Sequence, residues 1–166
     1  MKPTIVGLAA WLVTLAMVLS PFAVRAETAY FMVANPDLML IGLSDSYVLP
    51  LTNPDDIDFA RDIVQGGNGA IVFARVTAGG DGINRDRLAP GMPEWSWHVT
   101  EFMEFATAAI EICDGTPAFT EVDAQNAGEG EEWIICYWNY TVVAEVTETV
   151  PVEESKWGRI KALFGD

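Results

Sequence analysis

The pattern of hydrophobic and polar positions divides the chain into three parts. An apolar run over 5–19 comes first, and a middle part of short apolar segments with a two-residue period follows it. Turn residues separate these segments, which is the pattern of β-strands that bury one face. Near its end the chain becomes Pro- and Glu-rich and then amphipathic. The expected parts are a leader over 1–26, a single β-rich domain over 27–147, and a linker and tail over 148–166.

Eight short segments of the middle part are predicted to be strands, because they combine β-branched and aromatic residues with flanking turn residues. The second segment follows the turn signal Asn35-Pro36-Asp37, which suggests a hairpin with the first. Another hairpin is expected around Asn139. The predicted strands are 28–34, 38–43, 47–51, 70–76, 95–99, 108–113, 133–138 and 140–146.

Two short helices are predicted between the strands. Asn53 can cap the first, Pro54 suits the first helical position, and the aspartates that follow favour the positive end of the helix dipole. Gly66-Gly67 ends this helix. Thr116-Pro117 repeats the opening and predicts a second helix to about Gln125. Because strands and helices do not alternate as in parallel sheets, we expect a mainly β fold, an antiparallel β-sandwich or barrel-like domain with two short helices.

The first 26 residues have the order of a secretory signal peptide. Lys2 provides the positive charge, Ser20-Pro21 interrupts the apolar run, and Val24-Arg25-Ala26 places small or neutral residues where signal peptidase requires them. Cleavage is expected between Ala26 and Glu27. The alternative is an uncleaved membrane anchor, but a bilayer requires roughly 20 apolar residues. The predicted location is therefore outside the cell, in the periplasm or on the cell surface.

The chain is strongly acidic, with 24 Asp and Glu against 9 Lys and Arg and a formal net charge of −15. Loss of the leader would remove the positive charges of Lys2 and Arg25 and change this charge from −15 to −17. Such a surface repels nucleic acid and anionic lipid, because binding to either depends on Lys and Arg at the phosphates. We therefore expect no nucleic-acid partner, and we attribute the acidity mainly to solubility.

Cys113 and Cys136 are the only cysteines. In an exported protein such a pair predicts a disulfide, worth about 3 kcal/mol through restriction of the unfolded chain. Metal ligation is the alternative, but tetrahedral zinc takes four ligands and the chain has one histidine. The loop over 81–86 carries oxygen ligands without the closing glutamate of an EF-hand. We therefore expect neither a metal nor another cofactor.

The sole histidine, His98, lies in an alternating segment after an irregular loop over 79–93. We predict that this loop and its neighbours bind an unknown protein or small ligand. The alternative is a small secreted hydrolase or metal-dependent enzyme that uses His98 with Glu101, Glu111 or Asp114. No Gly-x-Ser-x-Gly motif accompanies the histidine, so a non-enzymatic binding domain is favoured. The predicted binding residues are Trp95, Trp97, His98, Arg85 and Arg87.

The tail over 155–164 has an amphipathic pattern. Trp157, Ile160 and Phe164 fall on one side, and basic residues fall elsewhere. This pattern is typical of a segment that attaches to a membrane, the cell surface or a partner groove. The alternative is a short helix folded back on the domain, or a frayed end.

Several spaced elements together resemble a known family. They are Trp95-Ser96-Trp97-His98, Ala109-Ile110-Glu111-Ile112-Cys113-Asp114, Thr120-Glu121-Val122 and Trp133-Ile134-Ile135-Cys136-Tyr137-Trp138. The chain resembles the N-terminal domain of the calmodulin-binding-protein-related exported proteins over roughly Ala29–Val146. It departs from the pattern at Thr100-Glu101, which replaces an Asp-Pro, and in two extra residues between Trp133 and Cys136. The resemblance implies a small exported β domain with a Cys113–Cys136 bridge and little about activity.

Overall fold

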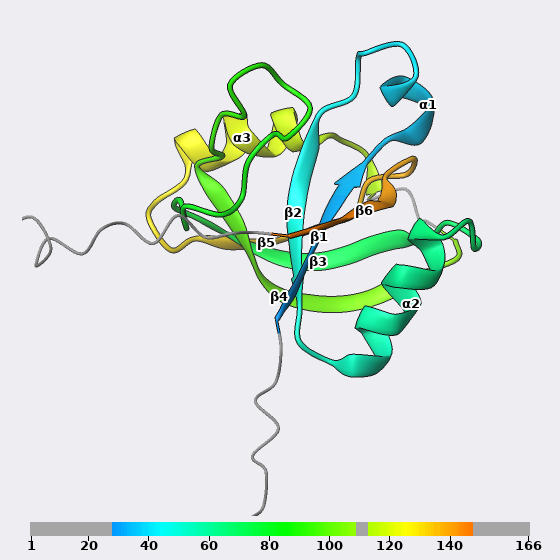
Figure 1. The fold of residues 1–166 in the computed structure, drawn as a ribbon. Helices are drawn as coiled ribbons and strands as arrows, with labels where there is room; N and C mark the ends of the chain where they lie inside the picture. The colour runs from blue at the N-terminus through cyan, green and yellow to red at the C-terminus, as the bar shows by residue number, and fades with distance from the viewer. Residues whose placement is uncertain (1–27, 109–112, 148–166) are drawn as a thin grey trace, which may run out of the picture.

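The computed structural model describes residues 28–108 and 113–147 (Figure 1). The predicted leader and tail lie outside these residues, as do four residues of the strand predicted over 108–113. The elements are β1 (Ala29–Ala34), α1 (Pro36–Met39), β2 (Ser46–Leu51), α2 (Pro54–Val64), β3 (Ile71–Ala78), β4 (Trp97–Ala106), α3 (Pro117–Asn126), β5 (Glu132–Ile135) and β6 (Thr141–Val146). Within the described ranges, no helix is long and apolar enough to cross a membrane.

The strands form two three-stranded antiparallel sheets, in the orders β2-β1-β6 and β4-β3-β5. The mainly β antiparallel fold is confirmed, and the two sheets of the described part do not close into a barrel. The hairpin predicted around Asn139 is wrong, because β5 pairs with β3 in one sheet while β6 pairs with β1 in the other. The chain changes sheets there, since Ile135 aligns with Ala74 and Val142 with Val33.

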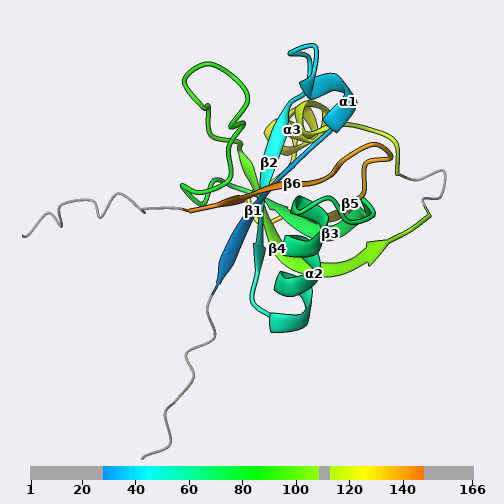
Figure 2. The ribbon, with the colours of Figure 1, turned by 45° about the vertical axis from the view of Figure 1, so that its right-hand side comes forward.

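One hydrophobic core is shared by both sheets and α2. The strands cross rather than align, and α2 lies against them at one end (Figures 1 and 2). β3 alternates half-buried and buried positions, as its sequence predicts for a strand with one face in the core. Both predicted helices are confirmed as α2 and α3, with caps at Asn53 and Thr116. The core includes Phe31, Leu49, Val72, Val76 and Trp97.

The strand predicted over 38–43 is wrong, because the chain forms α1 and a turn there. The Asn35 side chain accepts hydrogen bonds from the N–H groups of Asp37 (3.1 Å) and Leu38 (3.2 Å), which caps the helix. After α1, the Leu38 carbonyl accepts from Leu43 N–H at 3.0 Å and closes the turn. Local capping therefore outweighs the strand preference of an apolar run that has no neighbouring strand.

Candidate functional site

The loop between β3 and β4 is fastened to the outer edge of β2 by two buried side chains. Asn84 Oδ1 accepts from Val48 N–H at 2.9 Å, and its Nδ2 donates to the Trp97 carbonyl at 2.7 Å. Asp86 Oδ1 accepts from the backbone N–H of Ser46 at 3.1 Å and from its hydroxyl at 3.0 Å. The predicted binding loop is therefore an ordered part of the fold.

Arg85 and Arg87, two predicted binding residues, both lie in this loop. The Arg85 guanidinium donates to the carbonyls of Gly82 (2.6 Å) and Ile83 (3.4 Å), so it supports the loop from within. The Arg87 backbone N–H donates to the Ser46 hydroxyl at 2.8 Å. Partial burial, and then the neighbouring Arg85 charge, lower the pKa of Arg87. Their binding role stays a prediction.

The two predicted tryptophans pack toward the core. Trp97 is fully buried, and its ring centroid lies 6.2 Å from that of Trp95 and 5.7 Å from that of Tyr47. Trp95 is half-buried, and its indole N–H donates to the Ser46 carbonyl at 2.8 Å. Trp97 therefore serves the core, whereas part of Trp95 remains open to a ligand.

His98 is half-buried, and its Nδ1 lies 2.7 Å from the Gly79 carbonyl. Because a carbonyl only accepts, Nδ1 carries the proton and donates. Among the candidate acids, Glu101 pairs with an arginine of β3 at 3.1 Å, Asp114 is exposed, and Glu111 lies outside the described residues. In 28–108 and 113–147, His98 bonds to no carboxylate, and no group of three or more His, Cys, Asp or Glu could hold a metal ion. The geometry therefore does not favour the enzyme alternative.

A polar network joins α3 to the turn before β6. Asp45 accepts from Ala118 N–H at 2.9 Å, in the first turn of α3, and from the Tyr140 hydroxyl. The Thr120 and Tyr137 hydroxyls share a buried hydrogen bond of 2.6 Å. Burial is the largest cause that raises the pKa of both Tyr137 and Tyr140, and Asp45 raises that of Tyr140 further. Both phenols therefore stay protonated at neutral pH.

The predicted disulfide is confirmed. Cys113 and Cys136 are bridged with their Cα atoms 4.6 Å apart. Next to the bridge, Trp138 N–H donates to the Cys113 carbonyl at 3.2 Å. The bridge therefore holds the segment that begins at Cys113 beside the turn that carries Trp138.

Sequence reasoning missed an exposed apolar tip, which we define as Leu40, Ile41 and Leu43. Their exposed fractions are 86%, 65% and 71%. The tip directly follows α1 and lies at the end of the molecule that also carries α3 and the 79–96 loop (Figures 1 and 2). A signal was present, because Asn35-Pro36-Asp37 has the same residues as the cap of α2, Asn53-Pro54-Asp55.

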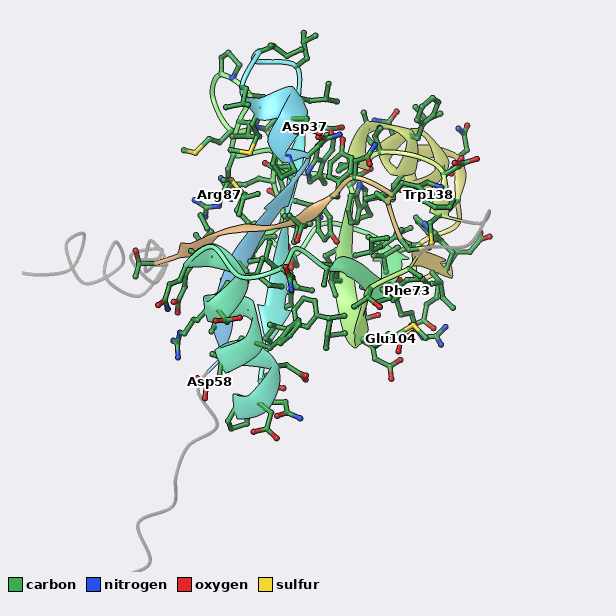
Figure 3. The ribbon with its side chains drawn as sticks, turned by 90° about the vertical axis from the view of Figure 1, so that its right-hand side faces the viewer. Asp37, Asp58, Phe73, Arg87, Glu104 and Trp138 are labelled. Carbon is green, nitrogen blue, oxygen red and sulfur yellow. A yellow bond between two sulfur atoms is a disulfide. The ribbon has the colours of Figure 1, made fainter. Side chains whose placement is uncertain are left out.

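Two neighbouring surface hollows, of about 310 and 260 Å³, also escaped the sequence analysis. Trp138, Asn139 and Tyr140 line both, and Trp138 is 44% exposed. Asp37 lines the larger hollow and Asp114 the smaller. In Figure 3, Asp37 and Trp138 lie toward the end that carries α1 and α3, away from Asp58 and Glu104. Residues from α1, from the segment after Cys113 and from the β5–β6 turn thus meet at one surface.

Comparison with known proteins gives one match. The family model for the N-terminal domain of the calmodulin-binding-protein-related proteins matches residues 27–149, which is more than half of the chain. The family resemblance expected from the sequence is thereby confirmed. No curated protein and no solved structure matches.

Proposed function

Because the chain belongs to the family of calmodulin-binding-protein-related N-terminal domains, we propose that it is an exported interaction domain without catalytic activity. The order of charged, apolar and small residues over 1–26 supports export to the cell surface, the periplasm or the medium. The Cys113–Cys136 bridge supports the same conclusion, because such bridges persist in oxidising compartments.

The apolar tip is the observation that carries the binding role. Burial of a Leu or Ile side chain is worth about 1.5–3 kcal/mol, so a partner that covers Leu40, Ile41 and Leu43 gains several kcal/mol. The tip is already ordered, since Ile41 N–H and Leu43 N–H both donate to the Leu38 carbonyl (3.3 and 3.0 Å). Binding therefore orders little additional backbone, which lowers its entropic cost.

We assign the tip to an apolar groove on a partner protein. The tip is convex and follows an acidic helix turn at Asp37, and the chain as a whole has a net charge of −15. Anionic membranes repel such a charge, since their surface potential attracts Lys and Arg. A protein groove with a basic rim offers both the apolar cover and the complementary charge.

The test places a photo-crosslinking phenylalanine analogue at Ile41 of the chain in its native secreting cells. The matched control places it at Val64, which is also an exposed aliphatic residue, in α2. We expect a discrete crosslinked protein from position 41 and not from position 64. We further expect a variant with serine at Leu40, Ile41 and Leu43 to lose that partner in co-purification and to keep its melting temperature.

Two outcomes would overturn this proposal. One is equal crosslinking from positions 41 and 64, which would show no preference for the tip. The other is binding to neutral phosphatidylcholine vesicles that the triple serine variant abolishes, which would assign the tip to a membrane.

A further inference from the structure

We propose that the two hollows beside Trp138 each take one positively charged side chain of a basic peptide segment. This inference rests on the proposed interaction role, and it specifies the chemistry of the partner. The two hollows share one exposed indole, and each has a single carboxylate, Asp37 in one and Asp114 in the other. Among the described residues, no lysine or arginine lines either hollow.

The chemistry of the shared wall suits a cation. An indole face attracts a guanidinium or ammonium group, and arginine can also stack on the ring. A carboxylate beside the ring accepts charge-assisted hydrogen bonds from the same group. The exposed Asn139 side chain lies between the hollows and provides a further acceptor. Trp138 with Asp37 and Trp138 with Asp114 thus form two cation sites around one ring.

The site is rigid before any ligand arrives. The disulfide holds Cys113 beside the turn, and Trp138 N–H donates to the Cys113 carbonyl at 3.2 Å. Tyr140 N–H donates to the Tyr137 carbonyl at 3.1 Å and closes the turn. Gly115, which lines the smaller hollow, has a φ of +125°, a conformation that strains any residue with a Cβ atom. The wall is therefore fixed on both of its segments.

Continuity with the apolar tip indicates what kind of segment the partner presents. Pro36, Asp37 and Leu38 of α1 line the hollows, and the tip begins one residue after α1 ends. A ligand that spans both surfaces needs basic residues for the hollows and apolar surface for the tip. The acidity of the whole chain would steer such a segment toward this end and increase its association rate.

The test is an NMR titration of the purified secreted chain with an acetylated, amidated peptide, Arg-Ala-Leu-Ala-Arg. The control peptide carries citrulline at both arginine positions, which removes the charge and keeps the shape. We expect the arginine peptide to shift the Trp138 indole N–H and the Asp114 amide, and to bind at least about fivefold more tightly than the citrulline peptide. Asp37→Asn and Asp114→Asn should each weaken binding about three- to tenfold.

Asp55→Asn provides the matched control variant, because it makes the same charge change at the exposed start of α2. The proposal is overturned if Asp55→Asn weakens binding as much as Asp114→Asn, which would indicate only general attraction. It is also overturned if the citrulline peptide binds equally well. If crosslinking at Ile41 fails while the arginine peptide still selects the Trp138 site, the tip proposal alone is overturned. The reverse pair of results overturns the hollows alone.

Discussion

The Asn84 side chain connects three parts of the fold, so its removal tests whether the 79–96 loop is structural. Asn84→Ala deletes the acceptor of Val48 N–H and the donor to the Trp97 carbonyl. Asn84 is only 1% exposed, and both partner groups belong to buried residues. Because each buried polar group left without a partner costs about 1–3 kcal/mol, the two together should cost about 3 kcal/mol or more. The melting temperature should fall by roughly 10 °C.

Urea denaturation followed by tryptophan fluorescence measures this loss, and Asn68→Ala is the control. Asn68 is exposed, so its substitution should stay within about 0.5 kcal/mol of the wild-type chain. A loss below about 1 kcal/mol for Asn84→Ala would refute the reasoning, because it would mean that water replaces both hydrogen bonds without penalty.

Asn84→Asp adds a pH dependence to the same experiment. The new carboxyl would face the Trp97 carbonyl in a buried place, which raises its folded pKa above the unfolded value near 3.9. Its stability is then fully present below the unfolded pKa, where the protonated carboxyl donates to the carbonyl. That stability is lost as the pH rises through the folded pKa. The difference between the Asn84→Asp and wild-type chains should therefore grow from acid toward neutral pH.

Three further predictions concern stability and export. Replacement of Cys113 and Cys136 by serine should lower the free energy of unfolding by about 3 kcal/mol in urea denaturation, and equal stability would contradict the role of the bridge. The raised pKa values of Tyr137 and Tyr140 imply that stability is fully present below their ordinary value near 10 and is lost as the pH rises above it. Phenolate absorbance should therefore appear together with unfolding, and earlier ionisation of all tyrosines would contradict the burial argument. Intact-mass analysis of the secreted chain should show a start at Glu27, and a retained leader would argue against cleavage.

Most of the fold could be predicted because its signals are local. The period of two marks β3, and cap-plus-proline openings mark α2 and α3. Pairing across the molecule has no such local signal. The two pairings that matter, β5 with β3 and β6 with β1, depend on contacts between residues about 60 to 110 positions apart. A hairpin is the natural expectation for two adjacent strands, and here it is wrong.

The candidate site was harder to predict, because exposure depends on tertiary packing. An aromatic residue reads the same in sequence whether it is buried like Trp97 or 44% exposed like Trp138. The apolar run at Leu40 resembles a strand because apolar residues are usually assigned to a core. Only the repeated Asn-Pro-Asp cap distinguishes a helix there, and at its first occurrence the same residues also fit a turn.

The cover on the edge of β2 has a consequence for how this chain behaves at high concentration. A free strand edge is a template on which further chains can stack into aggregates, through its row of unpaired N–H groups. On β2, the outward N–H groups of Ser46 and Val48 are taken by Asp86 and Asn84. The next position of the same parity is Pro50, which has no N–H to offer. This edge therefore gives an incoming strand no donor to bind, and the chain is protected there against fibril-like self-assembly.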